Sequence, residues 1–106
     1  MTPQTYIRAV RDLYTQLPHT SGRFSRYDRQ IASDFYQRQV PLDTLRSAML
    51  LAIARRIYRP GPPLPTIRSL HYFAPVVDEI LLKPLPSGYL QYLEDKIAKS
   101  RQLGIQ

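Results

Sequence analysis

Apolar residues in this chain recur at intervals of three and four, which is the spacing of one face of an α-helix. The first such stretch follows Pro3, where a proline at the first helical position gives up an N–H that has no partner there. Its apolar residues are Tyr6, Val10, Leu13, Tyr14 and Leu17. Because Pro18 interrupts the pattern, we expect the first helix over residues 3–16.

A second helix is expected over residues 26–38. Ser25 and Asp28 have the spacing of a capping box, in which two side chains each bond the other residue's backbone N–H at a helix start. The apolar residues that follow at i, i+4 and i+8 are Tyr27, Ile31 and Phe35. This spacing predicts that Tyr27 points into the core and anchors the start of the helix.

The strongest helical pattern begins at Leu42, directly after Val40-Pro41. It continues through Leu45, Met49, Ile53 and Ile57, and the positions between them are mostly apolar as well. A helix that is apolar all round belongs in the centre of a domain. VPLDTLRSAM (40–49) also resembles the start of a helix-turn-helix recognition helix. In that alignment Phe35 stands where the motif has a small residue, and Gln39 stands where it has glycine.

The last third of the chain contains two proline-rich connections. PGPPLP (60–65) predicts an extended and fairly stiff segment. The helical pattern that follows contains Pro75, which has no N–H to donate and so predicts a kink or a break into two helices. KPLPSG (83–88) is a second linker, and a final amphipathic helix is expected from Tyr89 to about Gly104.

These elements predict one all-α domain of about five helices over residues 1–106. The chain has no cysteine, which excludes disulfides, thiolate metal sites and cysteine nucleophiles and suits a reducing compartment. It contains no apolar stretch of signal-peptide or membrane-spanning length. We therefore expect a soluble, cytoplasmic protein that does not bind a membrane.

The arrangement of charge gives the first functional indication. The formal net charge is +7. Residues 1–70 hold eleven arginines against four aspartates, whereas residues 71–106 balance four basic against four acidic residues and contain all three lysines. The planar fork of arginine suits phosphate and guanine better than the point charge of lysine. Codon bias could explain why arginine is used in place of lysine, but it does not explain why the arginines are segregated. A binding role and codon bias both stay open as explanations for the choice of arginine.

The inventory of catalytic groups is small. His19 is expected in a loop and His71 in the core or at its edge, and neither has a histidine partner at the spacing of a helical metal site. Adjacent carboxylates in a helix point in different directions, and the four glycines are too far apart for a phosphate loop. Arg68 and Tyr72 beside His71 lack the supporting residues of a phosphoryl-transfer site. We expect no enzymatic activity, no metal and no cofactor.

The charge pattern favours a nucleic-acid-binding protein, with DNA expected before RNA. The candidate contact residues are Arg23, Arg26, Arg29, Arg46, Arg55, Arg56 and Arg59. Most would contact phosphates, and Arg46 at the head of the third helix is the expected base reader. The helix start within GRFSRYDRQ (22–30) would add free N–H groups for a phosphate, and exposed aromatic residues could stack on bases.

Three stretches resemble uncharacterised small helical proteins of bacterial mobile genetic elements. They are SRYDRQIA (25–32), VPLDTLRSAMLLAIARR (40–56) and IRSLHYFAPVVDEIL (67–81). The resemblance covers most of residues 17–82 and brings no activity with it. It implies a setting in plasmid, phage or transposon biology, where DNA or a nucleoprotein enzyme would be the partner.

The alternative is a protein-interaction module. Such a protein would be an accessory or inhibitory subunit that docks its basic face onto a larger nucleoprotein enzyme. Tyr89, Tyr92 and the tail RQLGIQ (101–106) would then form a dimer or partner surface. A purely structural role is a third possibility, and the sequence leaves the oligomeric state open.

Overall fold

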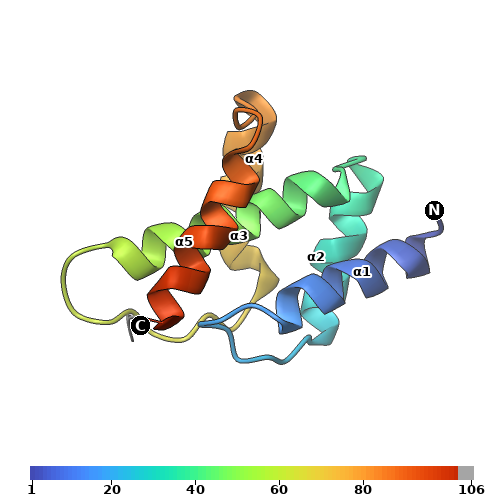
Figure 1. Cartoon of the computed structure of the whole chain (residues 1–106). Helices are drawn as coiled ribbons and strands as arrows, with labels where there is room; N and C mark the ends of the chain where they lie inside the picture. Colours follow the sequence, from blue (N-terminus) through green and yellow to red (C-terminus); the bar gives the residue numbers. More distant parts are fainter. Residues whose placement is uncertain (103–106) are drawn as a thin grey trace.

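The computed structural model describes residues 1–102, which form five α-helices and one 3₁₀ turn (Figure 1). The elements are α1 (Pro3–Thr15), α2 (Arg26–Gln37), α3 (Leu42–Tyr58), η1 (Leu70–Phe73), α4 (Ala74–Leu82) and α5 (Tyr89–Gln102). The predicted all-α class and number of helices are confirmed. No helix within this part of the chain combines the length and apolarity needed to cross a membrane.

The helix starts follow the local signals in the sequence. The side chain of Thr2 accepts a hydrogen bond from the N–H of Thr5 at the start of α1. Ser25 and Asp28 form the expected capping box at the start of α2. Pro75 lies in the first turn of α4, so the expected break separates η1 from α4. The expected end of the last helix at Gly104 lies outside the described residues.

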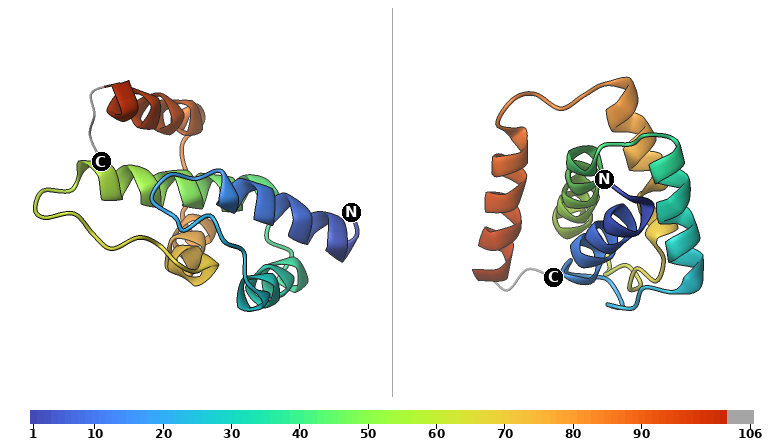
Figure 2. Two further views of the ribbon diagram at one scale, coloured as in Figure 1. Left: turned by 90° about the horizontal axis from the view of Figure 1, so that it is seen from below. Right: turned by 90° about the vertical axis from the view of Figure 1, so that its right-hand side faces the viewer.

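Helix α3 occupies the centre of the molecule. The left view of Figure 2 shows α3 between α5 on one side and α4 with η1 on the other, and α1 also packs against α3. Leu45, Met49 and Ile53 are buried on α3, as are Ala48 and other residues between them. The apolar surface on all sides of this helix is therefore used, as its sequence predicts.

The start of α2 differs from the prediction. Tyr27 is 59% exposed, whereas Asp28 is completely buried and shares the core face with Ile31 and Phe35. The prediction that Tyr27 anchors the core is thus wrong. The spacing from residue 28 to 31 to 35 is as helical as the spacing that starts at Tyr27, so periodicity could not separate the two faces.

Hydrogen bonds explain why a carboxylate occupies this core position. One oxygen of Asp28 accepts from the backbone N–H and the hydroxyl of Ser25, at 2.8 and 2.9 Å. The other accepts from the backbone N–H of Leu70 at 2.8 Å and from the Ser69 hydroxyl at 3.3 Å. Because buried carboxylates need several partners, this residue joins α2 to η1. His71, the next residue in η1, was expected in the core or at its edge; its side chain is exposed.

The connections before α2 and after α3 run beside each other. The N–H of Ile67 donates to the carbonyl of His19 at 2.8 Å, and the N–H of Ser21 donates to the carbonyl of Ile67 at 2.9 Å. Both connections lie at the bottom of Figure 1. Residues near position 20 and residues near position 67 thus lie side by side.

Candidate nucleic-acid interface

Two of the candidate contact residues, Arg46 and Arg55, pair with carboxylates of the last third of the chain. Arg46 donates to Glu94 of α5 at 2.5 Å, and Arg55 makes two hydrogen bonds with Glu79 of α4, at 2.5 and 2.9 Å. The hydrogen bond from Arg55 lowers the pKa of Glu79 and raises the pKa of Arg55. Arg46 and Arg55 therefore both have a local negative counter-charge.

These two arginines also point in different directions. They are nine positions apart, which is about two and a half turns of an α-helix and puts them on opposite sides of α3. Their partners confirm this, because α4 and α5 lie on opposite sides of α3 in the left view of Figure 2. The arginines of α3 do not form a single basic face.

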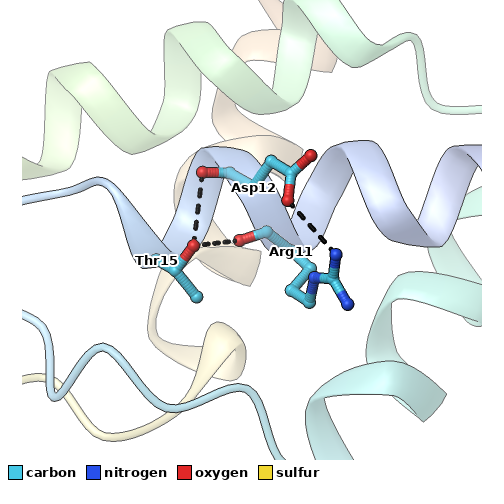
Figure 3. Close-up of polar contacts among 3 residues, drawn as sticks. All are labelled: Arg11, Asp12 and Thr15. Carbon is cyan, nitrogen blue, oxygen red and sulfur yellow. Dashed lines mark hydrogen bonds and ion pairs between the residues drawn. The ribbon is translucent and has the colours of Figure 1, made fainter.

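Other arginines outside the connections are paired as well. Arg38 donates to Asp78 at 2.7 Å. Arg11 lies 3.5 Å from the carboxylate of its neighbour Asp12, at the end of α1 where the Thr15 hydroxyl donates to the Arg11 carbonyl (Figure 3). All of these ion pairs are exposed to solvent, so each contributes little to stability but lowers the local positive potential.

Arg56 is buried, in contrast to its neighbour Arg55. Only 8% of it is exposed. Its guanidinium donates to the carbonyls of Leu64 and Pro65, to the Nδ1 of His19 at 3.4 Å and to the hydroxyl of Tyr72 at 3.4 Å. It also lies over the Tyr72 ring, 5.6 Å from the centroid. Arg56 thus fixes the proline-rich connection to α3 and is not a surface contact.

The remaining candidates lie on the two neighbouring connections. Arg59 is exposed and donates one hydrogen bond to the carbonyl of Pro62 at 2.9 Å. Arg23, Arg26 and Arg29 are exposed and form no ion pair with any residue between positions 1 and 102. These four side chains keep a positive charge that no neighbouring carboxylate offsets.

Two stretches of the chain without acidic residues meet at the two connections. Residues 13–27 and 44–77 contain no aspartate or glutamate, and the hydrogen bonds between His19 and Ile67 bring these two stretches together. We define the loop face as the exposed arginines and tyrosines of the two connections, residues 19–27 and 59–72, together with Arg29. It consists of Arg23, Arg26, Tyr27, Arg29, Arg59, Arg68 and Tyr72. The left view of Figure 2 looks onto the two connections that carry it.

Arg68 and Tyr27 of the loop face do not stand out as contact residues in the sequence pattern. Arg68 was considered only as part of a catalytic cluster, although it belongs to the acid-free stretch. The exposed Tyr27 was assigned to the core. The helix start itself is less suited to a phosphate than expected, because the N–H of Asp28 bonds to Ser25 and a buried carboxylate already faces the positive end of the dipole.

The helix-turn-helix resemblance stays a prediction. Gln39, at the position of the motif's glycine, has the left-handed conformation that glycine favours, with φ of 59°. The candidate recognition helix is α3, however, and α1, α4 and α5 all pack against it. The loop face is less covered than this helix.

No protein-family model matches the chain, and neither do any of the curated proteins or solved structures. Between residues 1 and 102, no three histidine, aspartate or glutamate side chains come together as a possible metal site. The arginines and tyrosines of the loop face therefore carry the functional argument.

Proposed function

We propose that this protein is a non-enzymatic nucleic-acid-binding protein that contacts the phosphates of DNA through the loop face. The observation that carries the proposal is the meeting of two acid-free stretches. Their connecting segments carry four exposed arginines, Arg23, Arg26, Arg59 and Arg68, that have no ion pair within residues 1–102. A surface of this kind attracts a polyanion, and each arginine can bond phosphate oxygens through two N–H groups.

The aromatic residues of the loop face favour single-stranded DNA as the ligand. Tyr27 is 59% exposed and Tyr72 is 42% exposed. Exposed tyrosine rings stack on unpaired bases, which a duplex does not offer without being opened. We expect tighter binding to a single strand than to a duplex of the same length.

The test compares two double variants that remove the same charge. Arg23→Gln/Arg26→Gln removes two arginines of the loop face, and Arg46→Gln/Arg55→Gln removes two arginines that are paired with carboxylates. Binding of a fluorescent single strand is measured by anisotropy over a series of salt concentrations. We expect the salt slope to decrease by about 1.4 for the first variant, at about 0.7 per phosphate contact, and to change little for the second.

Equal losses in the two variants would show that binding depends on overall charge and not on the loop face. No measurable binding of the wild-type protein to single-stranded DNA, duplex DNA or RNA at low salt would contradict the proposal entirely. Stronger binding to duplex DNA would contradict the role of the tyrosines. A circular-dichroism melt of each variant confirms that it is folded.

One observation favours the alternative of a docking module. Leu81 and Leu82 at the end of α4 are 44% and 88% exposed, and Tyr92 on α5 is 50% exposed. Such residues are typical of protein contacts when they lie together. A larger protein that co-purifies in a fixed ratio and is lost in Leu82→Lys, without binding to naked nucleic acid, would favour this function. The two functions are compatible in one molecule.

A further inference from the structure

A cavity of about 280 Å³ lies beneath the proline-rich connection that follows α3. The residues that line it include His19, Arg56, Arg59, Gly61, Pro63 and Thr66. Two of them are arginines, and none of the lining residues is acidic. A positively charged hollow of this kind is suited to an anion.

The charge of Arg56 has no counter-ion among residues 1–102. Its partners are two carbonyl oxygens, a tyrosine hydroxyl and an imidazole, all of which are neutral. They satisfy hydrogen bonds but do not cancel the charge, and a buried charge is costly without an opposite one. Arg59 adds a second positive charge to the lining of the cavity. A bound anion would supply the missing negative charge.

His19 contributes a hydrogen-bond donor. Its Nδ1 accepts from the Nε of Arg56 at 3.4 Å, so in the neutral imidazole the proton is on Nε2. Burial, followed by the charge of Arg56, lowers the pKa of His19 and favours this neutral form. The backbone of His19 is left-handed, with φ of 68°, and the bond to Ile67 holds it in place.

We propose that this cavity binds a phosphomonoester group. A terminal phosphate carries close to two negative charges near neutral pH and three acceptor oxygens, which match two arginines and one N–H donor. The volume exceeds that of one phosphate and is at the lower limit of small-ligand pockets, about 300 Å³. The group could belong to the end of a nucleic-acid strand or to a small phosphate, and it would lie beside the loop face, with which the cavity shares Arg59.

The experiment measures binding of three probes. Inorganic phosphate and a nucleoside 5′-monophosphate are titrated by calorimetry. A single strand with a 5′-phosphate is compared by anisotropy with the same strand ending in a hydroxyl. We expect at least about tenfold tighter binding of the phosphorylated form for a charge-assisted contact of this kind. A preference between strands assigns the site to a strand end, whereas binding of the small phosphates alone assigns it to a free ligand.

Three single variants locate the binding. Arg59→Gln removes a cavity charge, and His19→Asn removes the Nε2 donor. Asparagine tolerates a left-handed backbone and can accept the Arg56 hydrogen bond, so this variant should fold. Arg8→Gln is the matched control, because Arg8 is an exposed arginine of α1 that does not line the cavity.

We expect Arg59→Gln and His19→Asn to lose the preference for phosphorylated probes and Arg8→Gln to keep it. Equal losses in all three variants would overturn the proposal. So would the absence of binding to the small phosphates together with equal affinity for the two strands. That result would leave the function of the loop face intact, since it concerns only the terminal phosphate and not the binding of the strand.

Discussion

The arginines on the two sides of this molecule have the same side chain but different surroundings. On the side of α4 and α5, Arg46 and Arg55 bond to carboxylates. On the side of the two connections, Arg56 and Arg59 bond to backbone carbonyls, which leave their charge in place. The partners of Arg55 and Arg46 are 24 and 48 residues away in the sequence. Folding, and not the clustering of arginines along the chain, thus decides where the positive potential remains.

The side of the two connections (the loop side) should owe its stability to a few buried polar contacts. The contacts of Asp28 should be the most important of them. Asp28→Asn replaces one carboxylate oxygen, which accepts two hydrogen bonds, with an amide nitrogen that cannot accept any. We expect the free energy of unfolding to fall by about 3 kcal/mol, because these are buried bonds to a charged group. Asp34→Asn in the same helix is the control, since Asp34 is exposed. Urea unfolding measures both, and equal losses would contradict the role of Asp28.

The neighbours Arg55 and Arg56 test the comparison directly. Arg56→Gln removes the bonds that hold Leu64 and Pro65, and we expect it to lower the free energy of unfolding by about 2 kcal/mol. Arg55→Gln removes an exposed ion pair and should cost much less. Urea unfolding of both variants gives the difference. If Arg55→Gln destabilised the protein as much as Arg56→Gln, the α4 side would be as important to stability as the loop side.

Local signals predicted the helices well. Pro3, the capping box of Ser25 and Asp28, and Pro75 each act through bonds or steric contacts within one helical turn, so the sequence near them is sufficient. Helix α3 was placed in the centre correctly, because it is apolar on every side.

The candidate site was less predictable, because the apolar surface on every side of α3 that identified its central position gives no information on the direction of its arginines. A helix that is apolar all round has no polar face by which to orient Arg46, Arg55 and Arg56, so their directions depend on which helices pack beside α3. The core position of Asp28 depends on Ser69 and Leu70, about 40 residues away. Contacts at such separations leave no pattern in a single sequence.

Two buried tyrosines should respond in opposite ways to loss of the hydroxyl. The hydroxyl of Tyr14, beneath the loop side, makes no hydrogen bond of normal geometry within residues 1–102. Burial raises its pKa, although the Ser21 hydroxyl is close enough to lower it. The hydroxyl of Tyr6 donates to the carbonyl of Val40 at 2.7 Å, and burial raises its pKa to about 12. Tyr6→Phe should cost about 1 kcal/mol of unfolding free energy, while Tyr14→Phe should cost nothing or increase stability. A loss in Tyr14→Phe would indicate that a buried water satisfies its hydroxyl.

The smallest effect on stability should come from a change of pH. His19 on the loop side and Glu79 on the α4 side should lose their contributions to stability in different pH ranges. Burial and the charge of Arg56 lower the pKa of His19 below its ordinary value of 6.5. Below pH 6.5 the unfolded chain therefore takes up this proton before the folded protein does, so stability falls as the pH drops from 6.5 to the folded pKa. The hydrogen bond from Arg55 lowers the pKa of Glu79 below 4.5, so its contribution is lost only at more acidic pH.

Unfolding free energies measured over this pH range should show the two losses in separate windows. His19→Asn should remove the decrease just below pH 6.5 and leave the lower window unchanged. Glu79→Gln should reduce only the decrease below pH 4.5. A His19→Asn variant that kept the upper decrease would show that a group other than His19 causes it, contrary to the lowered pKa that burial and Arg56 give His19. The carboxylate pairing on the α4 side would be unaffected by that result.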